Sequence, residues 1–133
     1  MVGAPAVGGA IMSVESLWEN ILNDFRKGRQ KVTGITLAGI AYLAKGLGRY
    51  TYKDRVFGME EVINAIEKLS EHITPLKYEI KDINPMSIPQ PLGRLVDVGI
   101  LERISTSPAR YRIKADYDTL MKIAGAIIME LIP

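Results

Sequence analysis

The chain has 133 residues, of which 47% are hydrophobic and 24% are charged, and its formal net charge is +2. A chain of this size can bury one core, so we expect one compact domain with short appendages. It contains no cysteine, which excludes disulfides, thiolate metal sites and a cysteine nucleophile and favours the reducing cytoplasm. Residues 1–12 lack a basic region and a long apolar run, so we interpret them as a flexible leader and expect no signal peptide or membrane span.

The charge is unevenly distributed along the chain. Residues 25–55 carry eight basic side chains against the single acid Asp54, so this segment has a net charge of +7 and the remainder has −5. Such asymmetry favours a surface that faces a polyanion, provided that folding gathers the charges on one side. A solvated face without a partner is the plainer interpretation.

Residues 13–58 are expected to form N-terminal helices followed by a basic segment. Ser13 is placed to cap the first helix, and Gly28 is placed to end it. A second helix is predicted from Thr36 to Lys45, where glycines follow. Basic and aromatic residues then alternate from Arg49 to Phe57. Such aromatics can stack on bases, although in a small protein they more often belong to the core.

Two further helices are predicted after residue 58. Apolar residues repeat at helical spacing from Met59 to Ile73, with glutamates between them, which predicts a helix with an acidic outer face. Thr74 and Pro75 are placed to start a short helix, because proline suits the first helical position. Asn84 and the proline after it end that short helix.

The helix predicted from Ser87 to Val98 has two contrasting faces, and Gly99 supplies a left-handed stop after it. At about 100° per residue, one face is apolar and the other is polar. The apolar face contains Ile88, Leu92, Leu95 and Val96, and the polar face contains Ser87, Gln90, Arg94 and Asp97. Two short alternating runs, "ILERI" and "RYRIK", flank the polar turn "STSPA". They predict a hairpin in which Tyr111 and Ile113 of the second strand point inward.

This order of helix, short helix, second helix, glycine and hairpin resembles the winged-helix family of helix-turn-helix DNA-binding domains, as found in small archaeal-type transcriptional regulators. The resemblance covers residues 59–114 and rests most on "LGRLVDVGILERI" and "ARYRI". It implies a mainly α fold with a small β-hairpin, a winged helix-turn-helix flanked by N- and C-terminal helices. In that family the second helix enters the major groove, and the wing contacts the adjoining DNA.

The resemblance implies a transcriptional regulator that contacts double-stranded DNA with the helix 87–98 and the wing 103–112. Gln90 and Arg94 suit adenine and guanine edges. Against this, Asp97 is placed to pair with Arg94, and two prolines remove N–H donors from the helix start. The expected DNA-contacting residues are Ser87, Gln90, Arg94, Arg103, Ser105, Thr106, Ser107, Arg110 and Arg112. A second candidate patch comprises Arg26, Lys27, Arg29, Lys31, Arg49, Lys53 and Arg55.

Residues 115–133 predict a C-terminal helix whose apolar arc is wider than packing against one core requires. Either the N-terminal helix of the same chain or the equivalent helix of a second copy is expected to cover the remainder. A homodimer would present two DNA-reading helices about one DNA turn apart. Its expected interface residues are Met121, Ile128 and Ile132.

No arrangement of residues typical of an enzyme is apparent. His72 is the only histidine, and the chain lacks a glycine-rich phosphate loop and a nucleophile with an evident base. We therefore expect a non-enzymatic protein without a cofactor or metal. The alternative to a DNA-binding regulator is a winged-helix protein–protein interaction module. It would be similar to those of archaeal AAA-type ATPases or of transcription and replication assemblies, without sequence-specific DNA binding.

Overall fold

The computed structural model of the chain describes residues 14–29, 31–73 and 84–131. Its elements are α2 (Val14–Arg26), α3 (Lys31–Leu47), the 3-10 turn η1 (Tyr52–Asp54), α4 (Met59–His72), the 3-10 turn η2 (Pro85–Ser87), α6 (Pro89–Asp97), β2 (Leu101–Thr106), β3 (Ala109–Ile113) and α7 (Tyr117–Leu131). The mainly helical fold with a small antiparallel hairpin confirms the predicted class. The expected leader, the Ser13 cap, the short helix at Thr74 and Ile132 lie outside the described residues.

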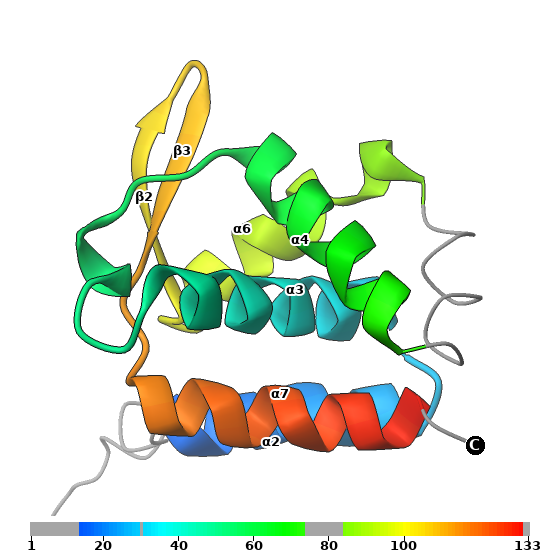
Figure 1. Cartoon of the computed structure of the whole chain (residues 1–133). Coiled ribbons are helices and arrows are strands. Elements are labelled where there is room, and N and C mark those ends of the chain that lie inside the picture. Colours follow the sequence, from blue (N-terminus) through cyan, green and yellow to red (C-terminus); the bar gives the residue numbers. More distant parts are fainter. Residues whose placement is uncertain (1–13, 30, 74–83, 132–133) are drawn as a thin grey trace, which may run out of the picture.

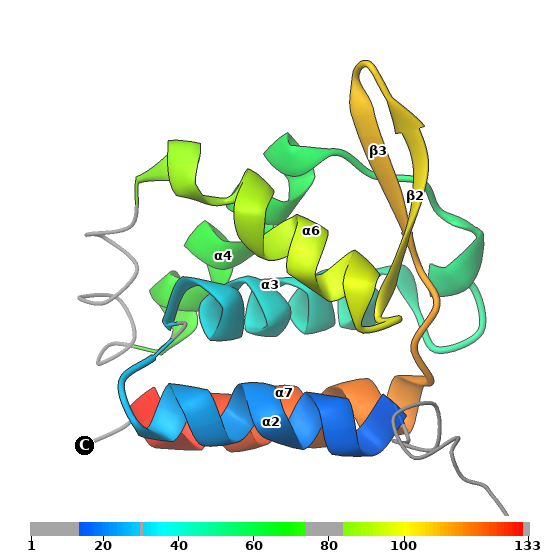
Figure 2. The ribbon, with the colours of Figure 1, turned by 180° about the vertical axis from the view of Figure 1, so that it is seen from behind.

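The helices are arranged in layers around α3. Figures 1 and 2 show α2 and α7 side by side in one layer, α3 lying along them, and α4 and α6 on the other side of α3. The β2–β3 hairpin extends beyond the helices, away from α2 and α7 (Figure 1). Because α3 packs against α2, α4, α6 and α7, it holds the other helices of the described fold together.

The central helix α3 is longer than the sequence predicted. It begins at Lys31 rather than at Thr36 and ends at Leu47. Threonine has a modest helix propensity, but Thr33 and Thr36 are both buried here. The Thr36 hydroxyl donates a hydrogen bond to the Val32 carbonyl at 2.7 Å, which satisfies its polar group within the helix. Tertiary packing therefore makes α3 longer than the helix propensities of its residues predict.

A close approach between α3 and α4 depends on Gly39. A Cβ at this position would lie 2.5 Å from Cγ1 of Ile66, so a larger residue would force the two helices apart. The α4 helix itself confirms the periodic pattern, because Val62, Ile66 and Leu69 are buried along one side. Its first turn is fixed by Glu61, whose Oε1 accepts a hydrogen bond from the Gly58 amide at 3.0 Å.

The predicted helix over residues 87–98 is divided in the structure. The turn η2 ends at Ser87, and α6 runs from Pro89 to Asp97 with its prolines in the first turn, where helical N–H partners are not required. The expected apolar face is confirmed: Ile88, Leu92 and Leu95 are buried and Val96 is partly buried. Gly99 follows with a φ of 84°, a left-handed conformation that glycine adopts without steric cost.

The hairpin strands pair in antiparallel register, with Glu102 opposite Arg112 and an irregularity between Arg103 and Ser105. Tyr111 and Ile113 are buried, as predicted. Phe57 adds an isolated bridge to Tyr111 on β3, with backbone hydrogen bonds of 2.9 and 2.8 Å. The bridge ties the segment before α4 to the hairpin.

The hydrophobic core crosses the boundary that we expected at residue 59. One buried cluster includes residues of α3, Phe57, α4, α6, both strands and α7. Tyr52 and Phe57 belong to it, as expected for aromatics of a small protein, whereas Tyr50 is 91% exposed. A unit limited to residues 59–114 would lack α3, the helix on which α4 and α6 both pack.

Candidate nucleic-acid interface

The outer side of α6 presents the polar residues that the sequence placed there. Gln90, Arg94 and Asp97 are exposed, and Ser87 is partly buried in η2. The Ser87 hydroxyl donates to the Asn84 carbonyl at 2.6 Å, so it stabilises the turn that leads into α6. Figure 2 shows α6 facing the viewer with the hairpin rising beside it.

Packing of α3 against α6 brings Lys31 to this polar face. The first turn of α3 and the outer face of α6 enclose a shallow depression of about 330 Å³. It is lined by Lys31, Val32, Thr33, Ser87, Gln90, Pro91 and Arg94. From the sequence, Lys31 belongs to the separate basic patch, because no local pattern indicates which helix the start of α3 contacts. The structure therefore adds a cation to the predicted base-reading surface.

Arg103 lies where the hairpin meets α6. Its guanidinium carbon is 5.7 Å from the centroid of the Tyr111 ring, a geometry that favours a cation–π contact. A Cβ at Gly93 of α6 would lie 3.9 Å from Nη2 of Arg103. In the part of the chain that the structure describes, Arg103 forms no ion pair with a carboxylate. Its exposed charge is thus held next to the α6 surface.

The two arginines of β3 that we expected to contact phosphates are each paired with a glutamate. Arg112 Nη2 donates to Glu102 Oε1 at 2.8 Å, and Arg110 Nη1 lies 3.5 Å from Glu61 Oε1. The hydrogen bond from Arg112 holds the pKa of the Glu102 carboxyl below its usual value. Both arginine side chains remain more than 40% exposed, so they are accessible to solvent despite their partners.

The tip of the hairpin is exposed to solvent. Ser105, Thr106 and Ser107 are all solvent-accessible, as expected for a contact loop. The Ser105 hydroxyl, however, donates to the Pro108 carbonyl at 2.8 Å. It therefore supports the turn, and its oxygen remains available as an acceptor.

The expected second basic patch does not form one surface. Arg26, Lys27, Arg29 and Lys31 lie where α2 connects to α3, whereas Arg49, Lys53 and Arg55 follow the opposite end of α3. A helix of 17 residues is about 25 Å long, which exceeds the Debye length of about 8 Å at physiological salt. Two members also have acidic partners: Arg26 pairs with Glu130 at 3.0 Å, and Arg49 pairs with Asp118.

Two of the three residues that we expected at a dimer interface lie at a groove within the chain, and the third, Ile132, lies outside the described residues. Met121 and Ile128 are partly buried and line a groove between α3 and α7. The α7 helix packs against α2, so the N-terminal helix of the same chain covers part of the apolar arc, which confirms one of the two expected coverings. Coverage by a second copy stays a prediction.

Comparison with known proteins found no family model, curated protein or solved structure that matches this chain. Within residues 14–29, 31–73 and 84–131, no helix is long and apolar enough to cross a membrane. The same ranges contain no group of three or more histidine or acidic side chains that could hold a metal ion. His72 is exposed, with its ring centroid 6.0 Å from that of Tyr42.

Proposed function

We propose that the chain is a winged-helix protein that binds double-stranded DNA, and that it acts as a transcriptional regulator. In this proposal α4 and α6 form the helix-turn-helix, and β2–β3 is the wing. The observation that carries it is the surface around α6, where Lys31, Gln90 and Arg94 line one depression and Arg103 lies beside it. An exposed helix with such side chains, next to a projecting hairpin, fits the way winged helices engage a major groove.

Side chains rather than backbone amides would supply the DNA contacts. Pro89 and Pro91 remove two N–H donors from the start of α6, so this helix start is a poor anion site. Arg94 is suited to bidentate contact with guanine and Gln90 to contact with adenine. Lys31 brings a further basic side chain from α3 to the face that carries Gln90 and Arg94.

The glutamate partners of the wing arginines do not prevent phosphate binding. Ion pairs at exposed positions contribute little to stability, and contact with phosphate releases condensed counterions from DNA. An arginine that exchanges its glutamate for a phosphate therefore loses little and gains the release of counterions. We propose that Arg110 and Arg112 make this exchange while Arg103 contacts DNA without it.

Duplex binding as a function of salt tests the proposal. We expect the anisotropy of a labelled mixed-sequence duplex to rise with protein concentration at about 50 mM salt and the affinity to fall steeply toward about 200 mM. A slope of log K against log salt of several units would support phosphate contacts by Lys31, Arg103 and the wing. Absence of binding at the lower salt concentration contradicts DNA binding.

Pairing of both wing arginines with glutamates favours one second candidate, a protein–protein interaction module. Arg112 with Glu102 and Arg110 with Glu61 make this side of the hairpin charge-balanced, as suits a surface that contacts protein. A chain that binds no duplex at low salt would fit this candidate.

A homodimer through α7 stays part of the proposed regulator, because two copies would present two α6 helices to successive DNA turns. Sedimentation of the chain at micromolar concentration tests it. Ile128→Glu would place an unpaired charge on the expected interface, so we expect this variant to be monomeric. A monomeric unmodified chain would remove the dimer without affecting DNA binding by each copy.

A further inference from the structure

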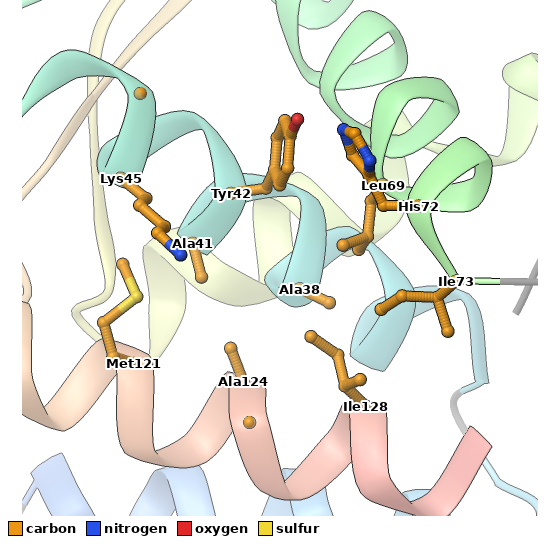
Figure 3. Close-up of a pocket in the computed structure, with 12 residues that line it drawn as sticks. Ala38, Ala41, Tyr42, Lys45, Leu69, His72, Ile73, Met121, Ala124 and Ile128 are labelled. Atoms are coloured by element: carbon orange, nitrogen blue, oxygen red, sulfur yellow. The ribbon is translucent and has the colours of Figure 1, made fainter. Parts of the chain in front are cut away.

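A groove with a volume of about 640 Å³ opens between the α3–α4 pair and α7. Figure 3 shows Ala38 and Ala41 of α3 facing Ala124 of α7 across it. These small side chains leave space that larger residues would fill, and a Cβ at Gly125 or at Gly46 would meet nothing within 4 Å. The groove is therefore an open depression between two packed layers.

The groove combines an apolar interior with a positive rim. Leu69, Ile73, Met121 and Ile128 contribute apolar surface. Lys45 extends from α3 toward Met121 in Figure 3. None of the described residues that line the groove is acidic. Within the described ranges, Lys45 forms no ion pair.

Two aromatic rings also border the groove. Tyr42 and His72 both line it, with ring centroids 6.0 Å apart. Figure 3 shows both rings directed away from α7. Among the described lining residues, Lys45 therefore supplies the charged group beside an apolar interior.

We propose that this groove binds an amphipathic carboxylate, with its apolar part over the alanines and its carboxylate paired with Lys45. The volume lies within the range of about 300–1,000 Å³ that is usual for small-molecule sites, which combine apolar walls with a few polar groups. A homodimer that uses Ile128 would cover this groove, so a ligand and a second copy are exclusive occupants, and the charge of Lys45 beside the apolar lining favours the carboxylate. The α4 and α7 helices, which border the groove, face the viewer in Figure 1, whereas α6 faces the viewer in Figure 2, which shows the molecule from behind. The groove and the proposed DNA-binding surface therefore lie on different sides of the molecule, and the proposal does not require DNA binding.

Three ten-carbon probes test the site on the full chain: decanoate, decanol and decylamine. Calorimetry below the micelle concentration should show decanoate binding most tightly, decanol more weakly and decylamine least. Lys45→Gln should weaken decanoate binding by about 5- to 10-fold, as expected for loss of a charge-assisted contact, and leave decanol unchanged. Lys53→Gln is the matched control, because it removes the same charge outside the groove, and it should leave all three affinities unchanged.

A second set of variants fills the groove. Gly125→Leu should abolish binding of both decanoate and decanol while the far-UV circular dichroism of the chain is retained. If that variant does not fold, Gly46→Leu repeats the test from the rim. Equal binding of decylamine and decanoate, or equal loss in Lys45→Gln and Lys53→Gln, would overturn the proposal. Failure of every probe to bind, with a dimer that Gly125→Leu dissociates, would also overturn it and assign the groove to a second copy.

Discussion

Arg112 and Glu102 occupy directly opposed positions of the two hairpin strands, and the guanidinium donates to the carboxylate at 2.8 Å. Opposed positions in an antiparallel pair bring side chains of opposite charge together. The contact therefore follows from the register of the hairpin rather than from any local motif. It places a negative charge on the surface that the proposed function presents to DNA.

Removing that negative charge should strengthen DNA binding. Glu102→Gln leaves Arg112 without its carboxylate partner and removes a negative charge from the surface that faces DNA, so we expect higher affinity for mixed-sequence duplex with a similar salt slope, because the number of phosphate contacts is unchanged. Fluorescence anisotropy at several salt concentrations measures both quantities. Glu67→Gln removes the same charge from the outer side of α4 and serves as control. Equal gains in the two variants would show that only net charge matters and that the Arg112 pair does not limit binding.

The double replacement of Arg110 and Arg112 by alanine should weaken binding to every duplex alike. Phosphate contacts carry no sequence information, so the loss should not depend on the DNA used. The salt slope should become shallower by about two units, one for each lost contact. An affinity that does not change would exclude the wing from the interface.

Arg94 and Lys31 line the same depression, but replacing each of them should change DNA binding in a different way. Arg94→Ala removes a candidate base contact, so it should cost about 1–3 kcal/mol on a preferred site and little on random duplex. Lys31→Ala removes a candidate phosphate contact and should weaken binding to both alike. Selection of a preferred site followed by parallel titrations measures the difference. Binding that responds to Lys31 but never to Arg94 would indicate a DNA binder without sequence preference.

Tyr52 links η1 to the start of the C-terminal segment. Its hydroxyl donates to the Ala115 carbonyl at 2.6 Å in a buried position, so Tyr52→Phe should lower the free energy of unfolding by about 1–3 kcal/mol. Burial, followed by the nearby Asp116 charge, raises the pKa of Tyr52. The folded state therefore retains this proton more firmly, and the stability that it contributes is present below about pH 10 and lost above it. Denaturant unfolding should show the difference between the two proteins narrowing as the pH rises beyond that point.

Asp116 caps the first turn of α7. Its carboxylate accepts hydrogen bonds from the Thr119 amide and hydroxyl, both at 3.2 Å, and the backbone bond from Thr119 is the main reason that the pKa of Asp116 is lowered. Asp116→Ala should lower the Tm by a few degrees at neutral pH, because the helix loses its cap. A carboxyl group whose pKa is lowered by folding stabilises the folded state at pH values above its unfolded pKa. This contribution is lost as the pH falls through the pKa of the folded state. The two melting temperatures should therefore converge below about pH 4, and a difference that persists there would exclude the cap as its cause.

Periodicity in the sequence predicted most of the secondary structure correctly. The spacing of Val62, Ile66 and Leu69 predicted α4, and the alternation of Tyr111 and Ile113 predicted the inner face of β3; all five are buried. Gly99 was expected at a left-handed position and has a φ of 84°. These features depend on neighbours close in sequence, so they can be inferred without knowledge of the fold. The start of α3 could not, because burial of Thr33 and Thr36 outweighs their modest helix propensity.

The sequence by itself determined which side chains face outward on α6 and β3, since helical and strand periods fix relative directions along one element. Only the tertiary structure decided what those side chains meet. Lys31 reaches the Arg94 surface because α3 packs against α6, and Arg110 meets Glu61 because Phe57 bridges the start of α4 to β3. Small residues on α3 and α7 become a groove only when the two helices lie together. Each of these contacts joins residues far apart in the chain, and their proximity arises from packing around one shared core, which no local pattern records.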